Sequence, residues 1–438
     1  MKNPFIIQDT LTNRISFYHI ILFVASLPFD RFYSEITLIS FALHTLIHFK
    51  RKRLHGFPVK QVLLLQSIFF VTVVASVYTI NPSSVFKEWE KQLAILLFPL
   101  LLAVTPLDLK KYKINFLTAF AVSCVITVFY LDVDALRIIR YNHLPFLALF
   151  SDAFINQNFS DAIDIHPTYL SMYVALSIVC MLTFLFSQQS IIRKMLACFC
   201  IILLSVSLLQ LGSKSVLIAF LFLMMLSPLF LHRSKYNRKV FFLPALILVL
   251  AAITIFQFKS LQKRFISNLV QDVTRKDIGA TKNEYRIARW QAAVDLIKQS
   301  PVIGFGTASE IKLLKKKYFE RRLYNSFINE LNAHNQYLSV MIKAGVLGLI
   351  VFLYTLYYAF TKAIKSNDFV MFSFLVIVTV VSFSENILEV NKGIFYYSFF
   401  FSLFVLALPK ERHFSQGQRQ PLRQKKRFYY KRPVEITI

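Results

Sequence analysis

The stretch of sequence that decides the fold covers residues 195–231 and reads MLACFCIILLSVSLLQLGSKSVLIAFLFLMMLSPLFL. It contains two long apolar runs, 195–211 and 215–231, and between them lies only the short turn Gly212-Ser213-Lys214. A bilayer core about 30 Å thick requires about 20 apolar residues per helix, because only a helix satisfies its own backbone hydrogen bonds in hydrocarbon. The stretch therefore predicts two membrane-spanning helices joined by a minimal turn.

Apolar runs of the same kind recur along the chain of 438 residues. Apolar residues make up 56% of the sequence and charged residues only 17%, whereas a soluble domain carries about a quarter charged residues. The runs also lack the alternation of a transmembrane β-barrel. The predicted spans are 15–28, 35–49, 62–80, 93–106, 114–131, 167–187, 195–211, 215–231, 240–257, 337–361, 369–386 and 394–408. The sequence therefore predicts an all-α polytopic membrane protein with about twelve transmembrane helices, or about ten if the shortest runs do not span.

The short loops between these runs are basic on one side of the predicted membrane. Cytoplasmic loops carry an excess of Lys and Arg, so this side and both termini are predicted to face the cytoplasm. The basic loops are Lys50–Arg53, Lys110–Lys113, Arg193–Lys194, Arg233–Lys239 and Lys362–Lys365. The opposite side collects 81–92, 132–165 and 259–336, and the last of these is too long for the rule to apply.

These boundaries predict four parts of the chain. Residues 1–257 form a transmembrane bundle, 258–336 a large and partly helical periplasmic loop domain, 337–408 the last helices, and 409–438 a basic disordered cytoplasmic tail. Much of the net charge of +27 lies in the short loops and the tail. The membrane explains it there, so we expect membrane lipids and no nucleic acid as partners. The four cysteines lie inside apolar runs and show no metal-ligand spacing and no disulfide framework.

The polar run Asn332-Ala333-His334-Asn335-Gln336 lies where the long external loop meets the next predicted span. One interpretation is a helix cap in which an Asn side chain supplies the capping oxygen. The other is catalytic, because His334 would lie at the water–membrane boundary, where a lipid-linked substrate presents its head group. An imidazole there can take a proton from a hydroxyl nucleophile near neutral pH. The residues alone leave both interpretations open.

The segment 286–299 of the external loop has helical spacing, with Ile287, Trp290, Ala293, Val294 and Ile297 on one predicted face. Arg286 and Arg289 lie at its start. Arginine offers a planar fork that matches phosphate and stays protonated, although a solvated helix face explains such residues equally well.

Three further features have both a structural and a functional interpretation. Lys214 at a helix end can snorkel to the interface or contact an anion. Gly304-Phe305-Gly306 is typical of a turn, and its N–H groups could also form a nest for phosphate oxygens. His166-Pro167 is typical of a helix start with Pro in the first turn.

Taken together, these patches resemble the O-antigen ligase and O-antigen polymerase (Wzy-C-like) superfamily of bacterial envelope glycosyltransferases, over residues 160–405. The motifs that carry the resemblance are His166-Pro167-Thr168-Tyr169-Leu170, Gly212-Ser213-Lys214, Arg286-x-x-x-Trp290, Pro301-Val302-Ile303-Gly304-Phe305-Gly306, Ala333-His334-Asn335-Gln336-Tyr337-Leu338 and Gly345-Val346-Leu347-Gly348. The resemblance implies a protein of the bacterial inner membrane whose active site faces the periplasm. There a glycan moves from a polyprenyl-diphosphate carrier to an acceptor hydroxyl.

The resemblance also implies roles for individual residues. His334 would be the catalytic residue, and Arg286, Arg289 and Lys214 would bind the substrate diphosphate. The family places Arg where this chain has Lys214, and lysine keeps the charge but loses the bidentate fork. The supporting residues would be Asn335, Gly304, Gly306 and His166. The external loops show no paired-carboxylate metal signature, so we expect no metal and no cofactor, with fixed cations stabilising the leaving group. The acidic residues Asp132, Asp134, Asp152, Asp161 and Asp164 leave a metal-dependent alternative.

The acceptor distinguishes the functions that remain. An O-antigen ligase uses a lipid A-core sugar or a similar glycolipid, a polymerase uses a second lipid-linked repeat, and some relatives glycosylate proteins. We favour the ligase, because 332–338 and 382–393 look ligase-like. A polysaccharide or lipid-linked-oligosaccharide transporter is the alternative from a different class. The large external domain and the lack of internal repeats argue against a transporter.

Overall fold

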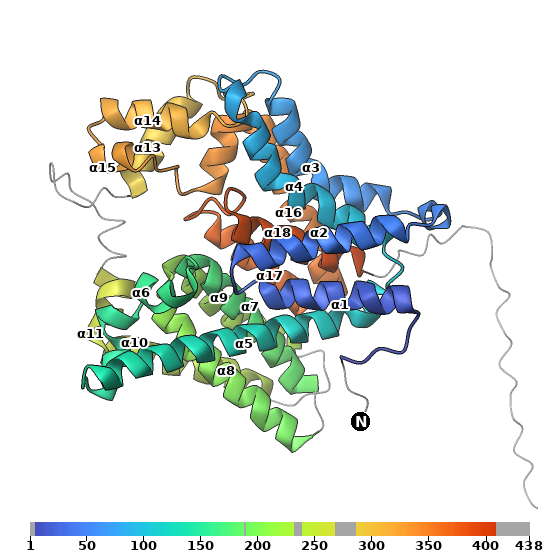
Figure 1. The fold of residues 1–438 in the computed structure, drawn as a ribbon. Coiled ribbons are helices and arrows are strands. Elements are labelled where there is room, and N and C mark those ends of the chain that lie inside the picture. Colours follow the sequence, from blue (N-terminus) through green and yellow to red (C-terminus); the bar gives the residue numbers. More distant parts are fainter. Residues whose placement is uncertain (1–4, 188–189, 232–238, 268–285, 409–438) are drawn as a thin grey trace, which may run out of the picture. The chain divides into compact units, whose positions relative to one another are not determined.

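The computed structural model describes residues 5–187, 190–231, 239–267 and 286–408, and within these ranges the chain is helical and contains no strand (Figure 1). Each of the twelve predicted spans falls on a helix. These helices are α1 (Leu11–Ser26), α2 (Arg31–Ile47), α3 (Val59–Ala75), α4 (Val85–Val104), α5 (Leu109–Tyr141), α7 (Pro167–Ser187), α8 (Ile191–Leu211), α9 (Lys214–Leu231), α10 (Lys239–Gln257), α16 (Gln336–Ser366), α17 (Phe369–Val381) and α18 (Asn391–Leu406).

Four helices of the described chain, α5, α7, α8 and α16, are long and apolar enough to cross a membrane by themselves. A fifth span results if Pro244–Gln257 of α10 is joined to the segment Lys259–Ser267, which bends away from it by 102°. The chain is therefore a helical membrane protein, and the count of twelve spans stays a prediction.

Short helices fill the connections. They are η1 (Arg51–Leu54), η2 (Pro82–Ser84), η3 (Phe146–Phe150), η4 (Asp152–Phe154), α6 (Gln157–Ser160), η5 (Asp161–Ile163), α11 (Lys259–Gln262), η6 (Lys263–Ser267), α13 (Arg286–Ile297), α14 (Glu310–Glu320) and α15 (Tyr324–Ile328). The last three lie close together in the predicted external domain (Figure 1). The tail 409–438 and the basic loop 233–239, except for Lys239, lie outside the described residues.

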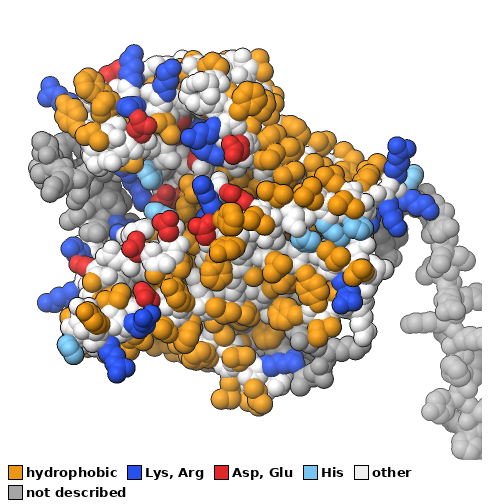
Figure 2. Space-filling view, viewed as in Figure 1, with side chains coloured by type: hydrophobic (Ala, Val, Ile, Leu, Met, Phe, Trp, Pro, Cys, Tyr) orange, Lys and Arg blue, Asp and Glu red, His pale blue; other side chains and the backbone are white. Residues whose placement is uncertain are grey.

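The core of the bundle is built around α7 and α18, whose side chains are almost all buried. Aromatic rings interlock there: Tyr173 stacks on Tyr396 at 5.3 Å, and Phe120 meets Phe400 edge-on at 4.7 Å. On the outer face, apolar side chains cover most of the surface formed by α1, α2 and α5, as expected of helices that meet lipid (Figure 2). Charged side chains gather instead in the hollow beneath α13–α15 (Figure 2).

Hydrogen bonds and ion pairs show which loops lie at the same end of the helical bundle. At one end Arg53 Nη1 donates to the carbonyl of Val104 at 3.0 Å, and Lys113 forms an ion pair with Asp368. These residues lie in or beside the short basic loops. At the other end the Oγ atoms of Ser215 and Ser384 are 2.7 Å apart. Three of the five predicted cytoplasmic loops thus meet at one end, and the candidate site residues lie at the other.

This separation makes a topological prediction. In a cysteine-free background, Lys316→Cys on α14 should react with a membrane-impermeant maleimide in intact cells, and Ser366→Cys at the end of α16 should not. Both side chains are exposed, so access to the reagent depends on the compartment alone. Labelling of Ser366→Cys from outside would reverse the orientation.

Several helix ends differ from the predicted boundaries, and two of these differences bear on the candidate site. The helix of the span predicted over 114–131 does not end at 131, because α5 continues to Tyr141 and reaches about 50 Å, well beyond the thickness of a bilayer core. Asp132 and Asp134 are therefore helical and not loop residues. The span predicted over 369–386 ends earlier, since α17 stops at Val381 and residues 382–390 form an irregular loop, here called the 382–390 loop.

Candidate functional site

His334 lies directly before α16. The N-cap of that helix is Asn335, whose side chain accepts hydrogen bonds from the N–H groups of Tyr337 at 3.0 Å and Leu338 at 3.1 Å. The structure therefore has the predicted Asn cap, and the capping residue is Asn335. His334 itself stands outside the helix in a left-handed conformation (φ 46°), and its N–H donates to Asn332 Oδ1 at 3.0 Å. Its imidazole is thus left for another partner.

That partner is Glu385 in the 382–390 loop. Nδ1 of His334 lies 3.2 Å from Glu385 Oε2, and Nη2 of Arg286 lies 3.4 Å from Glu385 Oε1. One carboxylate thus bridges the predicted catalytic histidine and the predicted phosphate-binding arginine, and these three residues are here called the Glu385 cluster. The Glu385 side chain is 9% exposed, against 27% for His334 and 37% for Arg286. The buried acid lies behind two residues that a substrate can reach.

The electrostatics of the cluster keep Glu385 charged. Burial alone would raise the pKa of Glu385, but the hydrogen bond from His334 and the charges of His334, Arg286 and His166 outweigh it and lower that pKa. A charged carboxylate on Nδ1 fixes the orientation of the imidazole and leaves Nε2 as the nitrogen for an acceptor proton. Sequence reasoning missed Glu385 because it placed this residue inside an apolar span. The signal was available, since an acid inside a span is expensive and therefore usually functional.

Arg286 is the first residue of α13, and Arg289 lies one turn further on. The prediction of a helix over 286–299 is confirmed up to Ile297, but of the residues on the predicted apolar face only Ala293 is fully buried. Val294 is 39% exposed, and Arg289 is buried. The buried residues are Ala288, Arg289, Ala292, Ala293 and Leu296. The small alanine side chains allow α13 to pack closely against α16. The helix therefore turns its alanine face inward, and Arg289 on this face lies in the interior, where it has contacts.

The turn at Lys214 reaches the same region. Gly212 ends α8 in a left-handed conformation (φ 62°), which suits glycine, and Lys214 begins α9. The hydrogen bond between Ser215 and Ser384 ties this turn to the 382–390 loop. Arg264, which sequence reasoning did not single out, donates from Nε to the carbonyl of Gly212 at 3.0 Å and from Nη2 to Asn156 Oδ1 at 2.7 Å. A further cation therefore holds the turn.

His166 begins the adjoining wall, immediately before Pro167, the first residue of α7. The predicted helix start is confirmed. The side chain is exposed to the solvent of a cavity, yet enough protein surrounds it that burial lowers its pKa. The charges of Glu385, His334, Arg286 and Arg264 also act on His166. It is therefore a neighbour of the Glu385 cluster, without a hydrogen bond to it.

The two loop glycines serve the turn and not an anion nest. The N–H of Phe305 donates to the carbonyl of Ile342 at 2.8 Å, and that of Gly306 to Lys343 at 2.9 Å. The N–H of Gly304 donates to Ser300 at 3.2 Å. A Cβ on Gly304 would lie 2.6 Å from the carbonyl oxygen of Ile342, so only glycine allows this approach to α16. With its N–H groups bound to carbonyls, the turn is a support for α16.

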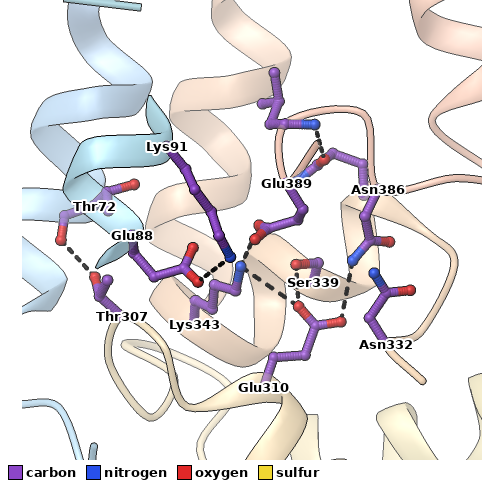
Figure 3. A network of polar contacts seen from close by, with 12 residues as sticks. Thr72, Glu88, Lys91, Thr307, Glu310, Asn332, Ser339, Lys343, Asn386 and Glu389 are labelled. Carbon is purple, nitrogen blue, oxygen red and sulfur yellow. Dashed lines mark hydrogen bonds and ion pairs between the residues drawn. The ribbon is translucent and has the colours of Figure 1, made fainter. Parts of the chain in front are cut away.

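Figure 3 shows a buried charged network, and its Glu310 accepts hydrogen bonds from Ala333 and Asn386, the neighbours of His334 and Glu385 in the chain. Lys343 on α16 donates a hydrogen bond to Glu389 and forms an ion pair with Glu310 at 3.5 Å, while Lys91 pairs with Glu88 at 2.9 Å. Three carboxylates thus share two amines, and these five residues are here called the Glu310 network. Burial and the neighbouring carboxylates outweigh Lys343 and raise the pKa of Glu389 to about 8. With a proton on Glu389, the remaining charges balance.

This raised pKa predicts a pH dependence of stability. Between pH 4.5, the usual value, and about pH 8, the folded chain holds a proton on Glu389 that the unfolded chain has released. Stability therefore falls as pH rises through this window and levels off above it. Glu389→Gln should flatten that fall in the thermal unfolding midpoint measured in detergent. An equally steep fall in this variant would place the titration on another group.

The acidic residues of the metal-dependent alternative do not gather. Asp132 and Asp134 lie on α5, Asp152 lies 3.7 Å from Lys263, and Asp161 and Asp164 belong to the turn before α7. Among the described residues, no group of three or more His, Cys, Asp or Glu side chains is arranged to hold a metal ion. Metal independence remains a prediction.

A cavity of about 1200 Å³ opens beside these residues. His166, Tyr169 and Glu389 form part of its wall, and the first turns of α2 and α4 form another part. The arrangement therefore offers a proton acceptor, a set of cations and a substrate-sized cavity at one end of a membrane protein.

Sequence comparison covers part of this site. No curated protein matches the chain by sequence. A protein family does match, over a region that extends from within α8 to just past the middle of α16. This region contains Lys214, Arg286, Arg289 and His334, but neither His166 nor Glu385. The resemblance seen in the motifs is thereby confirmed, since residues 199–353 of this chain match the model of the family described as O-antigen ligase.

Proposed function

We propose that this protein is a ligase-type glycosyltransferase of the bacterial inner membrane, acting at its periplasmic face. It would move a glycan from a polyprenyl-diphosphate carrier to an acceptor hydroxyl, such as that of a lipid A-core glycolipid. The observation that carries the proposal is the single carboxylate of Glu385 between His334 and Arg286. It joins a group suited to proton transfer with a group suited to diphosphate, and glycosyl transfer with a diphosphate leaving group needs both.

The reaction divides between these residues. Nε2 of His334 takes the proton of the acceptor hydroxyl as its oxygen bonds to the anomeric carbon, and Glu385 stabilises the imidazolium that forms. The bond from the anomeric carbon to the diphosphate breaks, and polyprenyl diphosphate leaves with the electron pair. Arg286 faces the growing charge on the diphosphate, and Lys214, Arg289 and Arg264 add positive potential around it. Fixed cations would make a bound metal unnecessary.

Two other functions remain candidates. A polymerase shares the donor and the leaving group, and differs only in using a second lipid-linked repeat as acceptor. A transporter requires no proton acceptor, so the transporter hypothesis assigns no role to the contact between His334 and Glu385.

The test uses purified protein, a defined polyprenyl-diphosphate glycan and EDTA. Glycosylation of lipid A-core would support the ligase, and chain growth on a second lipid-linked repeat would support the polymerase. Activity that EDTA abolishes and magnesium restores would reject the metal-free mechanism and direct attention to the acidic residues between Asp132 and Asp164.

Arg286→Ala should weaken donor binding and slow transfer together, because Arg286 contacts the diphosphate before and during the reaction. A charge-assisted hydrogen bond of about 1.5–3 kcal/mol corresponds to about one to two decades in the donor Kd. Arg322→Ala is the control, since this exposed arginine lies in the same external domain after α14. An unchanged donor Kd in Arg286→Ala would leave Arg286 as a partner of Glu385 alone.

A further inference from the structure

The cavity beside the Glu385 cluster is a groove with two helical walls. Its walls are α2 and α4, and its end is closed by residues before and in α7 and by the start of α18. The charged lining residues are Asp30, Arg31, Glu35, Lys87, Glu90, Lys91, Asp164, His166, Glu389 and Lys392. The apolar lining residues of the walls are Leu38, Ile39, Ala42, Leu43, Leu93, Ala94 and Leu97.

Polarity changes in the same direction along both walls. On α2 the first turn is charged and the lining becomes apolar from Leu38 onward, and on α4 the change comes at Leu93. Both helices begin at the end of the molecule that carries the Glu385 cluster. For α2 the hydrogen bond from Asn391 to Glu35 at 2.8 Å shows this, and for α4 the contacts of Glu88 with Lys343 and Glu389 show it. The groove is therefore polar beside the cluster and apolar toward the middle of the bundle.

The apolar part is open to the side. Ile39 is 60% exposed, Leu43 56% and Leu93 42%, although they line a cavity. From Arg31 to Leu43, α2 advances about 18 Å, which is more than half the thickness of a bilayer core. A molecule in this groove can thus keep an apolar chain in the lipid while its polar end reaches the cluster.

The charges of the groove do not suit a diphosphate. With the proton that Glu389 holds, four charged carboxylates line the groove against four Lys or Arg side chains. Two of the four are already engaged, since Lys91 pairs with Glu88 and Lys392 donates to the carbonyls of Leu27 and Phe29. Carboxylates and the amides of Gln157 and Asn391 are groups that hydrogen-bond sugar hydroxyls. The predicted diphosphate-binding cations Arg286, Arg289 and Lys214 do not line this groove.

We propose that the groove between α2, α4 and the start of α18 binds the acceptor, and that this acceptor is a lipid-anchored glycan. The inference rests on the proposed glycosyl transfer. The lipid chain of the acceptor lies along the apolar walls, and the sugars of the acceptor meet the charged first turns. The reacting hydroxyl is presented past His166, whose surroundings include both the groove and the Glu385 cluster. A soluble protein acceptor has no use for the apolar half.

Ala42→Trp tests the assignment by filling the apolar part of the groove, where Ala42 is half-buried. Leu46→Trp is the matched control, one turn further along α2, 69% exposed and not part of the lining. The acceptor probes are lipid A-core, a second polyprenyl-linked repeat, and the core oligosaccharide released from its lipid. Donor binding is measured separately.

We expect Ala42→Trp to raise the KM for the lipid-anchored probe that the wild type uses by about ten-fold or more, the equivalent of about two methylene groups. The donor Kd of Ala42→Trp should match that of the wild type. Leu46→Trp should match the wild type in both the acceptor KM and the donor Kd. Three results would overturn the inference: an unchanged acceptor KM, an increase in the donor Kd instead, or equal wild-type use of the lipid-free oligosaccharide. Absence of wild-type transfer to every probe would instead reject the proposed function.

Discussion

We expect the His334→Asn protein to turn over about two to four decades more slowly than the wild type, which is the range for a lost general base. Its affinity for the polyprenyl-diphosphate donor should stay unchanged, because His334 acts on the acceptor hydroxyl. Asparagine is the replacement of choice, since it tolerates the left-handed backbone at this position (φ 46°). The loss can then be assigned to the imidazole and not to backbone strain.

The control is the same substitution at His143, an exposed histidine that also has a left-handed backbone (φ 51°). His143→Asn should transfer glycan at the wild-type rate. Donor binding and single-turnover transfer are measured for each folded variant. A His334→Asn protein with wild-type turnover would leave this residue as the neighbour of a helix cap.

The second large effect is expected at Glu310, the buried first residue of α14. Its carboxylate accepts from the N–H of Ala333 at 3.1 Å and from Asn386 Nδ2 at 3.2 Å, and it pairs with Lys343 (Figure 3). Ala333 precedes His334, and Asn386 follows Glu385. One buried side chain therefore holds both of the chain segments that carry the His334–Glu385 contact.

Glu310→Ala should lower stability by about 3–5 kcal/mol, the usual cost of removing one partner of a buried ion pair. Glu310→Gln keeps the acceptor for Ala333 and should lose less. Glu320→Ala is the control at the other end of the same helix, where the side chain pairs with Lys317 on the surface, and it should change little. The readout is the thermal unfolding midpoint in detergent. Equal unfolding midpoints for Glu310→Ala and Glu320→Ala would contradict the proposal that Glu310 holds the two segments together.

The sequence predicted the helices well because hydropathy reports directly on burial in lipid. Each predicted span lies on a helix, and the Asn335 cap follows from local hydrogen bonding alone. The errors came where polar residues sit at the end of an apolar run. The span over 369–386 took Glu385 and Asn386 into the membrane, whereas the chain leaves the helix at Val381 so that these side chains can find partners.

The site could be predicted only in part, because its contacts join distant segments. Arg286 and His334 were found from residue type and family motif. Glu385 lies 51 positions from His334, and Arg264 lies 52 positions from Gly212, the residue that it holds. No local pattern encodes such a pairing. The face of α13 was mispredicted for the same reason, since the close packing of α16 selects alanines and carries Arg289 inward.

The most direct test of the proposed chemistry is the stoichiometry of one turnover in proteoliposomes. The purified protein is mixed with excess polyprenyl-diphosphate glycan and lipid A-core in EDTA, and released polyprenyl diphosphate and glycosylated acceptor are counted together. The Glu385 cluster predicts one of each for every protein molecule in the first turnover, with both reduced in parallel in His334→Asn. Intact donor that has merely crossed the bilayer, with no glycosylated acceptor, would contradict a transferase and identify a transporter.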